Sequence, residues 1–462
     1  MTAKEQLKNL KGDSRRRFLK FASAVGAGLA LDRSEVLNVI SDSAGTAMAD
    51  EAACASTNRS ISLVAGNGGF AWFQLLFPHT EIAKAGNNNF AYHASPAESI
   101  DAVDTDRPFV FAPETPWQDL DSSKRITAMM AGFNQTHTAI PDSAANLGGG
   151  TSMLAAIASI QSELPALLPV IGVTPLSFGN ADGAPPLTTV GNPMGMVDLF
   201  NSSASQSILA VKEDAAQYEA YYKAFLSLNK ASSRPTMQSQ LRITKASANF
   251  LGQNLADLLR PTAGDLTRYG LDGAPNNIAE LGTGMIIAVK AFRLGLTNAV
   301  ILPALRDDPH GAFNNMGNLM DRVGRLGQMF DALMEDLAAS SDPACSNQNL
   351  ADTTVITIHG DTPKDPRRRS GWPDGTPQGS NWLYVLGAGY LKTGWFGGVR
   401  ENGDVDGFDP RTGDNVNGQQ ASVTAPAAGA AALYAVSQGD MERVNRFYNG
   451  DSIAGLVNEQ IL

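Results

Sequence analysis

The sequence predicts an α/β fold in which a mostly parallel central sheet lies between two layers of helices. Two observations support this prediction. Short apolar runs of strand length alternate along the chain with segments whose apolar residues recur at helical spacing. These apolar runs are continuous rather than alternating with polar residues, which is typical of strands that are buried on both faces.

Five apolar runs are expected to be strands of this sheet and two periodic segments are expected to be helices. The helices are Ile278–Leu296 and Leu319–Leu337, where apolar residues recur every three or four positions. The expected strands are Ile61–Gly66, Ala166–Val173, Ala299–Leu305, Thr353–Ile358 and Leu383–Leu386. In sheets of this kind, ligands bind in loops at the carboxyl ends of the strands.

The first 49 residues have the features of a twin-arginine (Tat) signal peptide. Arg15, Arg16 and Arg17 precede Phe-Leu-Lys, and the apolar stretch Phe21–Leu31 follows. This stretch is shorter than the ~20 residues that a membrane span needs. Ala47-Met48-Ala49 is a small-x-small cleavage site. We therefore expect export by the Tat machinery to the periplasm or beyond, with residues 1–49 as signal peptide and 50–462 as one α/β domain.

The composition of the mature chain excludes several classes of partner. After residue 49 it keeps 27 basic and 41 acidic residues, a net charge of −14, so we expect no nucleic-acid or anionic-membrane partner. No later stretch is apolar enough to span a bilayer. The two cysteines, Cys54 and Cys345, are compatible with a disulfide in an oxidising compartment and with two buried thiols.

Two of the five histidines directly follow expected buried strands. The strand ending at Leu305 leads into Asp308 and His310, and the strand ending at Ile358 leads into His359 and Asp361. Imidazole and carboxylate groups at neighbouring strand ends can converge on one point, as a divalent metal ion requires. The alternative is that these four are turn residues whose side chains bond the backbone.

A glycine-rich segment after the first strand matches a dinucleotide-binding pattern. Gly66–Ala71 has the form G-x-G-x-x-A. Pro78 interrupts the helix that should follow, and no strand ending in an acidic residue lies at the expected distance, so a glycine-rich turn is the preferred interpretation. The hypothesis that the protein is a cofactor-bearing oxidoreductase rests on this pattern alone. The chain contains no G-x-S-x-G, H-E-x-x-H or Walker motif.

The order of these segments resembles a family of Tat-exported bacterial proteins in the alkaline phosphatase/sulfatase-like superfamily. The segments that carry the resemblance lie between about residues 60 and 400. They are Leu63–Pro78, Asn277–His310, Leu319–Leu337, Thr353–Lys364, Gly375–Gly379 and Tyr384–Gly398. The resemblance implies an alkaline phosphatase-like fold and a site built around divalent metal ions.

Several positions depart from the family pattern. Asp308 and His310 stand where the family has the Asp and the His of W-D-T-H. Pro377 and Gln378 stand where it has the Asp-His pair of G-T-D-H, and Ala71 where it has an acidic residue. The resemblance therefore implies at most one divalent ion, Zn, Ca or Mg, in place of a two-metal centre.

The resemblance also indicates a nucleophile. The segment Asn134–His137 is similar to the family's Ser-His segment, which makes Thr136 the candidate, with Ser143 and Ser152 as alternatives. Because ligands are missing, we expect a catalytically drifted or non-catalytic envelope protein. The alternative is a metal-dependent hydrolase of phosphate or sulfate esters with a rearranged site. The substrate or binding partner is not indicated by the sequence.

Overall fold

The structure is a computed structural model of the chain. It describes residues 54, 56–66, 76–77, 99–100, 109–111, 126–132, 146–162, 164, 166–201, 255–306, 316–360, 381–399, 405–417 and 421–458. The chain divides into two compact units. The first consists of Met1–Cys54, Pro165–Leu167 and Met196–Arg260, and the second of Ala55–Leu164, Leu168–Gly195 and Pro261–Leu462. The predicted end of the signal peptide lies outside the described residues.

The first unit contributes one complete described helix, α11 (Leu255–Leu259), and the end of α7 (Pro193–Asp198), which begins in the second unit. Leu255, Ala256 and Leu259 of α11 are buried. In the described part of the chain, no helix is both long and apolar enough to cross a membrane.

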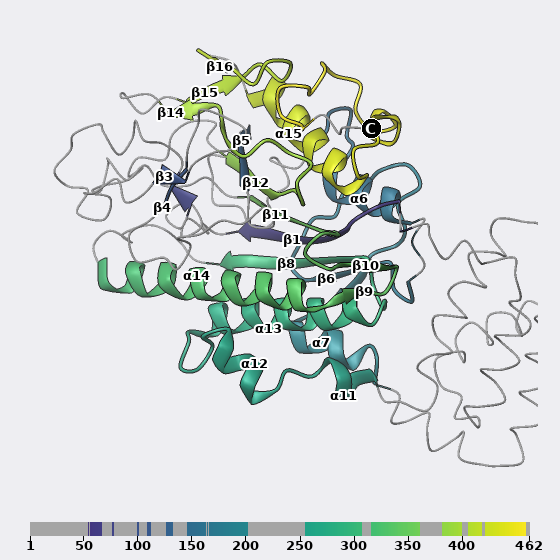
Figure 1. The fold of residues 1–462 in the computed structure, drawn as a ribbon, viewed down its shortest axis with the longest axis vertical. Helices are drawn as coiled ribbons and strands as arrows, with labels where there is room; N and C mark the ends of the chain where they lie inside the picture. The colour runs from purple at the N-terminus through teal and green to yellow at the C-terminus, as the bar shows by residue number, and fades with distance from the viewer. Residues whose placement is uncertain are drawn as a thin grey trace, which may run out of the picture. The chain divides into compact units, whose positions relative to one another are not determined.

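The second unit is built on an eight-stranded sheet with the order β13-β5-β12-β11-β1-β8-β6-β7 (Figure 1). Its strands are β1 (Arg59–Gly66), β5 (Ile126–Gly132), β6 (Val170–Val173), β7 (Thr188–Val190), β8 (Ala299–Arg306), β11 (Thr354–Gly360), β12 (Asn381–Leu386) and β13 (Gly394–Phe396). Every neighbouring pair is parallel except the two pairs that β12 makes, with β11 and with β5. The predicted α/β fold with a mostly parallel sheet is therefore confirmed.

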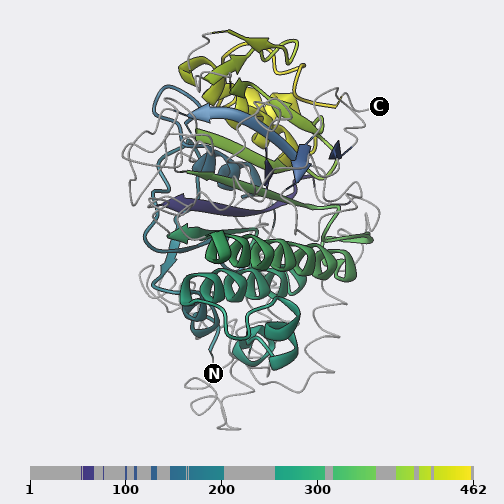
Figure 2. The ribbon, with the colours of Figure 1, turned by 90° about the vertical axis from the view of Figure 1, so that its left-hand side faces the viewer.

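Helices cover both faces of the sheet. α6 (Met153–Gln161) and α15 (Ala421–Val436) lie on one face, and α13 (Asn276–Arg293) and α14 (Met316–Ala339) on the other (Figure 1). Figure 2 shows the same layers from the side. Because both faces are covered, residues pointing in either direction from the central strands are buried, and the neighbours Ile61 and Ser62 of β1, which point to opposite faces, are 0% and 1% exposed.

Close approach of the helices depends on small residues. α15 is rich in alanine and almost entirely buried. A Cβ atom on its Gly429 would lie 2.6 Å from Leu147 Cδ2. On the other face, a Cβ on Gly284 of α13 would lie 2.9 Å from Leu302 Cδ2 on β8. A methyl group at either position would meet the end of a leucine side chain, which would have to shift to make room.

The remaining described elements are short. Three small sheets have the orders β2-β4-β3, β10-β9 and β14-β15-β16. Their strands are β2 (Leu76–Phe77), β3 (Ser99–Ile100), β4 (Phe109–Phe111), β9 (Ser341–Asp342), β10 (Cys345–Asn349), β14 (Gly398–Val399), β15 (Val405–Phe408) and β16 (Asn415–Val416). The short helices α12 (Ala263–Arg268) and α16 (Met441–Asn445) complete the described part.

A buried ion pair fixes the start of the central strand. Arg59, the first residue of β1, donates from Nη1 to Asp342 Oδ2 over 2.7 Å, and the two side chains are only 4% and 1% exposed. Asp342 pairs with Cys345 in the β9–β10 hairpin. Neither cysteine of the chain is free, since Cys54 and Cys345 are both disulfide-bonded. Of the two alternatives open for the cysteines, the structure has the disulfide.

Candidate functional site

The two strands that lead to the predicted metal ligands end at the same edge of the sheet. β8 and β11 flank β1 and run parallel to it, with Arg306 paired to Gly66 and His359 paired to Val64. Neighbouring strands lie ~4.8 Å apart, so the carboxyl ends of β8 and β11 are separated by about 10 Å. Loops that start from both ends are thus within reach of one ligand, and we call this edge the carboxyl edge.

Most of the predicted site residues lie outside the described residues. This is the case for Asp308 and His310, which follow β8, and for Asp361, which directly follows β11. It is also the case for Thr136, which follows β5, and for the glycine-rich segment after Gly66. Their convergence on one point therefore stays a prediction.

His359 is the one predicted ligand that the structure places. It lies at the carboxyl end of β11, is 2% exposed, and is paired with Val64, which belongs to the apolar core formed with α6 and α15. Neither ring nitrogen has a hydrogen-bond partner among the residues that the structure describes. Burial lowers the pKa of His359 to about 4, so the imidazole is neutral at pH 7, the form that binds metal ions.

Ser152, an alternative nucleophile, is held by a structural bond. It directly precedes α6, which runs from the carboxyl edge to the opposite end of the sheet, where Gln161 Nε2 donates to the Asn58 carbonyl oxygen. The Ser152 hydroxyl donates to the carbonyl oxygen of Phe178 over 2.7 Å. This bond occupies the proton that a nucleophilic serine would give to a base.

Three buried aromatic side chains lie on β12 and β13, on the face of the sheet opposite to His359, and no sequence motif singles them out. Trp382 and Tyr384 on β12 and Trp395 on β13 are each 4% exposed or less. We call them the aromatic cluster. The ring centroids of Trp382 and Trp395 are 3.5 Å apart, and those of Tyr384 and Trp395 are 6.5 Å apart. The available signal is the alternation Trp-Leu-Tyr at positions 382–384, of which the predicted strand Leu383–Leu386 includes only the last two residues.

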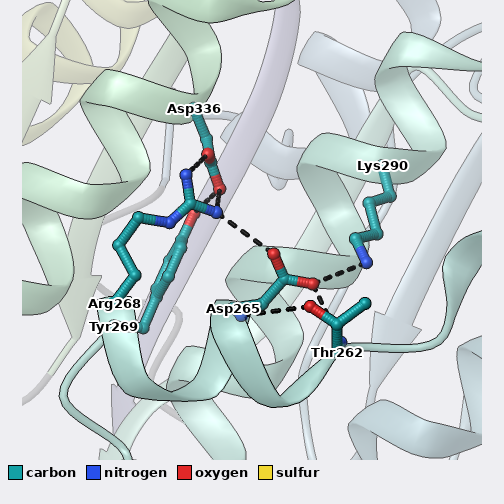
Figure 3. A network of polar contacts seen from close by, with 6 residues as sticks. All are labelled: Thr262, Asp265, Arg268, Tyr269, Lys290 and Asp336. Atoms are coloured by element: carbon teal, nitrogen blue, oxygen red, sulfur yellow. Dashed lines mark hydrogen bonds and ion pairs between the residues drawn. The ribbon is translucent and has the colours of Figure 1, made fainter.

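A larger polar network lies among the helices α12, α13 and α14 (Figure 3). Asp265 accepts hydrogen bonds from Lys290 Nζ at 2.7 Å, from the Thr262 backbone N–H at 2.9 Å and from Arg268 at 3.1 Å. Asp336 of α14 binds the Arg268 guanidinium and accepts the hydroxyl of Tyr269 over 2.8 Å. Asp265 thus connects α12 to α13, and Arg268 connects α12 to α14.

The electrostatics of this network agree with a structural role. Burial raises the pKa of Asp265, but hydrogen bonds from Lys290 and Thr262 outweigh burial and bring it to about 2. A surface hollow of about 380 Å³ next to it is lined by Arg268 and residues of α14. Because Arg268 is already paired with two carboxylates, it has no unbalanced charge to offer a ligand. We assign the network to the attachment of α12.

Among the residues that the structure describes, no three His, Cys, Asp or Glu side chains lie close enough together to hold a metal ion. Three of the four predicted ligands fall outside those ranges. No protein-family model, curated protein or solved structure matches this chain.

Proposed function

We propose that the protein is an exported periplasmic or envelope protein of the alkaline phosphatase/sulfatase-like type, catalytically drifted or non-catalytic, that binds one divalent metal ion at the carboxyl edge. The observation that supports it is the arrangement β8-β1-β11, which starts the two ligand-bearing segments about 10 Å apart at one edge. In open α/β sheets this is the edge where ligands bind.

The donor set fits a divalent ion. Asp308 and His310 follow the last residue of β8 by two and four positions, and Asp361 directly follows the last residue of β11. His359 supplies a neutral imidazole with both nitrogens unbonded in the described part of the chain, which is costly for a buried group that lacks a ligand. Three of these four side chains would be enough to hold a zinc-like ion, with one position left for water.

The disulfide supports export. Disulfides form and persist in oxidising compartments such as the periplasm and are rare in the cytosol. Cys54 lies shortly after the proposed signal peptide, and both it and Cys345 are bonded. The bond and the twin-arginine segment are independent features, and both favour the same location.

The first prediction concerns export. Replacing Arg15, Arg16 and Arg17 together by lysine should leave the full-length precursor in the cytoplasm, because the Tat machinery recognises the arginine pair. Cell fractionation and immunoblotting measure the distribution, with Arg33→Lys as the matched control that should still be exported. If the triple variant reaches the periplasm as efficiently as the unchanged chain, the Tat assignment is wrong.

The second prediction concerns the metal. The mature protein, loaded with Zn²⁺ and then dialysed, should retain about one ion per chain, and His359→Ala should retain only a small fraction of that. Elemental analysis gives the stoichiometry, and His93→Ala, which changes a histidine outside the proposed set, is the control. Absence of bound Zn²⁺, Ca²⁺ and Mg²⁺ from the unchanged protein would contradict the metal site.

The alternative function is hydrolysis of phosphate or sulfate esters. The neutral state of His359 meets one requirement of such an enzyme, because a protonated imidazole cannot bind a metal ion, and the drifted protein shares this feature. The bound ion would polarise the ester oxygen. We expect turnover of p-nitrophenyl phosphate and sulfate far below ~1 per second, and turnover at or above that rate would favour the hydrolase over the drifted protein.

A further inference from the structure

We propose that the carboxyl edge also binds an aromatic ring that carries an oxygen acceptor, and that Trp382 and Tyr384 donate hydrogen bonds to that oxygen. The inference rests on the proposed function for its location, since it names the kind of molecule that the same edge receives. It is carried by two buried donors that have no hydrogen-bond partner among the residues that the structure describes.

The direction of β12 places these donors at the right end of the sheet. β12 is antiparallel to β11, with Tyr384 opposite Ile358, so the first residues of β12 lie at the carboxyl edge. Trp382 and Tyr384 are two positions apart and therefore point to the same face of the sheet. Tyr384 is paired with Ala128 of β5, which is paired in turn with Trp395 of β13. The small Ala128 side chain leaves room for the Trp395 ring beside the Trp382 ring.

Both donors are almost completely removed from water. Trp382 is 3% and Tyr384 4% exposed, and neither Trp382 Nε1 nor the Tyr384 hydroxyl has a hydrogen-bond partner in the described ranges. Other tyrosines in those ranges are satisfied. Tyr269 donates to Asp336 and Tyr448 donates to the Asp451 carbonyl oxygen. Two unsatisfied donors side by side on one strand indicate an acceptor supplied from outside the chain.

The surroundings of the donors define the chemistry of that acceptor. Two indole rings and one phenol ring offer flat apolar surface, which an aromatic ring fills better than a compact inorganic ion. Indole N–H and phenol O–H are donors toward an oxygen, so an aromatic carboxylate is a suitable probe. Because Tyr384 is paired with Ile358, His359 as the next residue of β11 points to the opposite face of the sheet, and the ring lies across the sheet from that imidazole.

The first experiment measures binding of benzoate to the mature protein by isothermal titration calorimetry in the presence of EDTA. Benzoate should bind, and the non-aromatic cyclohexanecarboxylate should bind at least several-fold more weakly. Trp382→Phe and Tyr384→Phe each keep a ring but remove one donor, and each should weaken benzoate binding by about 5–10-fold. Tyr448→Phe, which removes a satisfied hydroxyl elsewhere, is the control and should not change the affinity.

The second experiment tests the unsatisfied donor without any ligand. Tyr384→Phe should leave the thermal midpoint unchanged or raise it, because it removes a buried hydroxyl that makes no bond. Tyr269→Phe, which removes a buried hydroxyl bonded to Asp336, should lower the midpoint by a few degrees. If Tyr384→Phe lowers it as much as Tyr269→Phe, the hydroxyl is already bonded in the free protein and the inference is wrong.

Absence of benzoate binding, or equal binding by both Phe variants and the unchanged protein, also overturns the inference. The proposed metal site is judged separately by elemental analysis. Failure of the aromatic site therefore leaves that result intact, and failure of the metal site does not affect a titration in EDTA.

Discussion

Replacing Asp342 by alanine is expected to lower the free energy of unfolding by about 3–5 kcal/mol. The change leaves the Arg59 guanidinium buried without its counter-charge at the first residue of β1. β1 pairs with both β8 and β11, so a disturbance at its start reaches the three central strands together. Urea unfolding followed by circular dichroism measures the loss.

An exposed ion pair provides the matched control for this prediction. Asp321→Ala removes the same kind of side chain from a pair with Arg325 on the surface of α14, and should cost only about 0.3–0.5 kcal/mol. The double change Arg59→Met with Asp342→Leu should recover most of the stability, because it removes both buried charges. Equal losses for Asp342→Ala and Asp321→Ala would show that the buried pair contributes little.

Acidification from pH 6.5 to pH 4 is expected to remove about 3 kcal/mol of stability from the metal-free protein through His359 alone. Burial holds the pKa of this imidazole at about 4 in the folded state, whereas an exposed histidine titrates near 6.5. Between these values the unfolded chain binds a proton that the folded chain does not. Stability therefore falls as the pH is lowered through this window, and the loss is complete below about pH 4.

The variant His359→Leu separates this effect from other titrations. It cannot be protonated, so its stability should change less with pH between 6.5 and 4 than that of the unchanged protein. Asp265 contributes in a lower window, because its depressed pKa of about 2 makes its stabilisation disappear only as the pH falls below the ordinary value of 3.8. Urea unfolding at several pH values in EDTA measures both slopes. Equal slopes would mean that His359 is not a neutral buried group.

Periodic and continuous apolar patterns predicted much of the fold correctly. The two expected helices are confirmed as α13 and α14, and the expected strands in β1, β8 and β11 are confirmed with shifts of one or two residues. The run Ala166–Val173 is a strand only over Val170–Val173. Leu383–Leu386 is a strand, but β12 runs against its neighbours, and strand direction depends on the connections rather than on the run itself.

Two elements of the core could not be recognised from their residues. α15 contains Pro426 and Gly429 and is almost entirely buried, so it has neither the composition nor the apolar stripe of an ordinary surface helix. β5 has the sequence Ile-Thr-Ala-Met-Met-Ala-Gly, with few of the β-branched and aromatic residues that favour strands. Both are fixed by tertiary packing, since α15 packs against β5.

The location of the candidate site could be predicted from the sequence, but not all of the residues that lie there. The rule that ligands bind at the carboxyl ends of parallel strands applies to β8 and β11, and it directed attention to His359. It could not find Trp382 or Tyr384. They lie in the first part of β12 instead of following a strand, and they are near the edge only because β12 runs in the opposite direction.

That reversal also determines how the edge can change over evolution. The chain leaves the sheet at Gly360 and re-enters it at Asn381, and both points lie on the same side. Residues 361–380 are therefore attached at the rim at both ends, and insertions or deletions between those two points need not alter the register of any strand. Changes in sequence between those two points can bring new residues and new ligand preferences while the packed layers stay as they are.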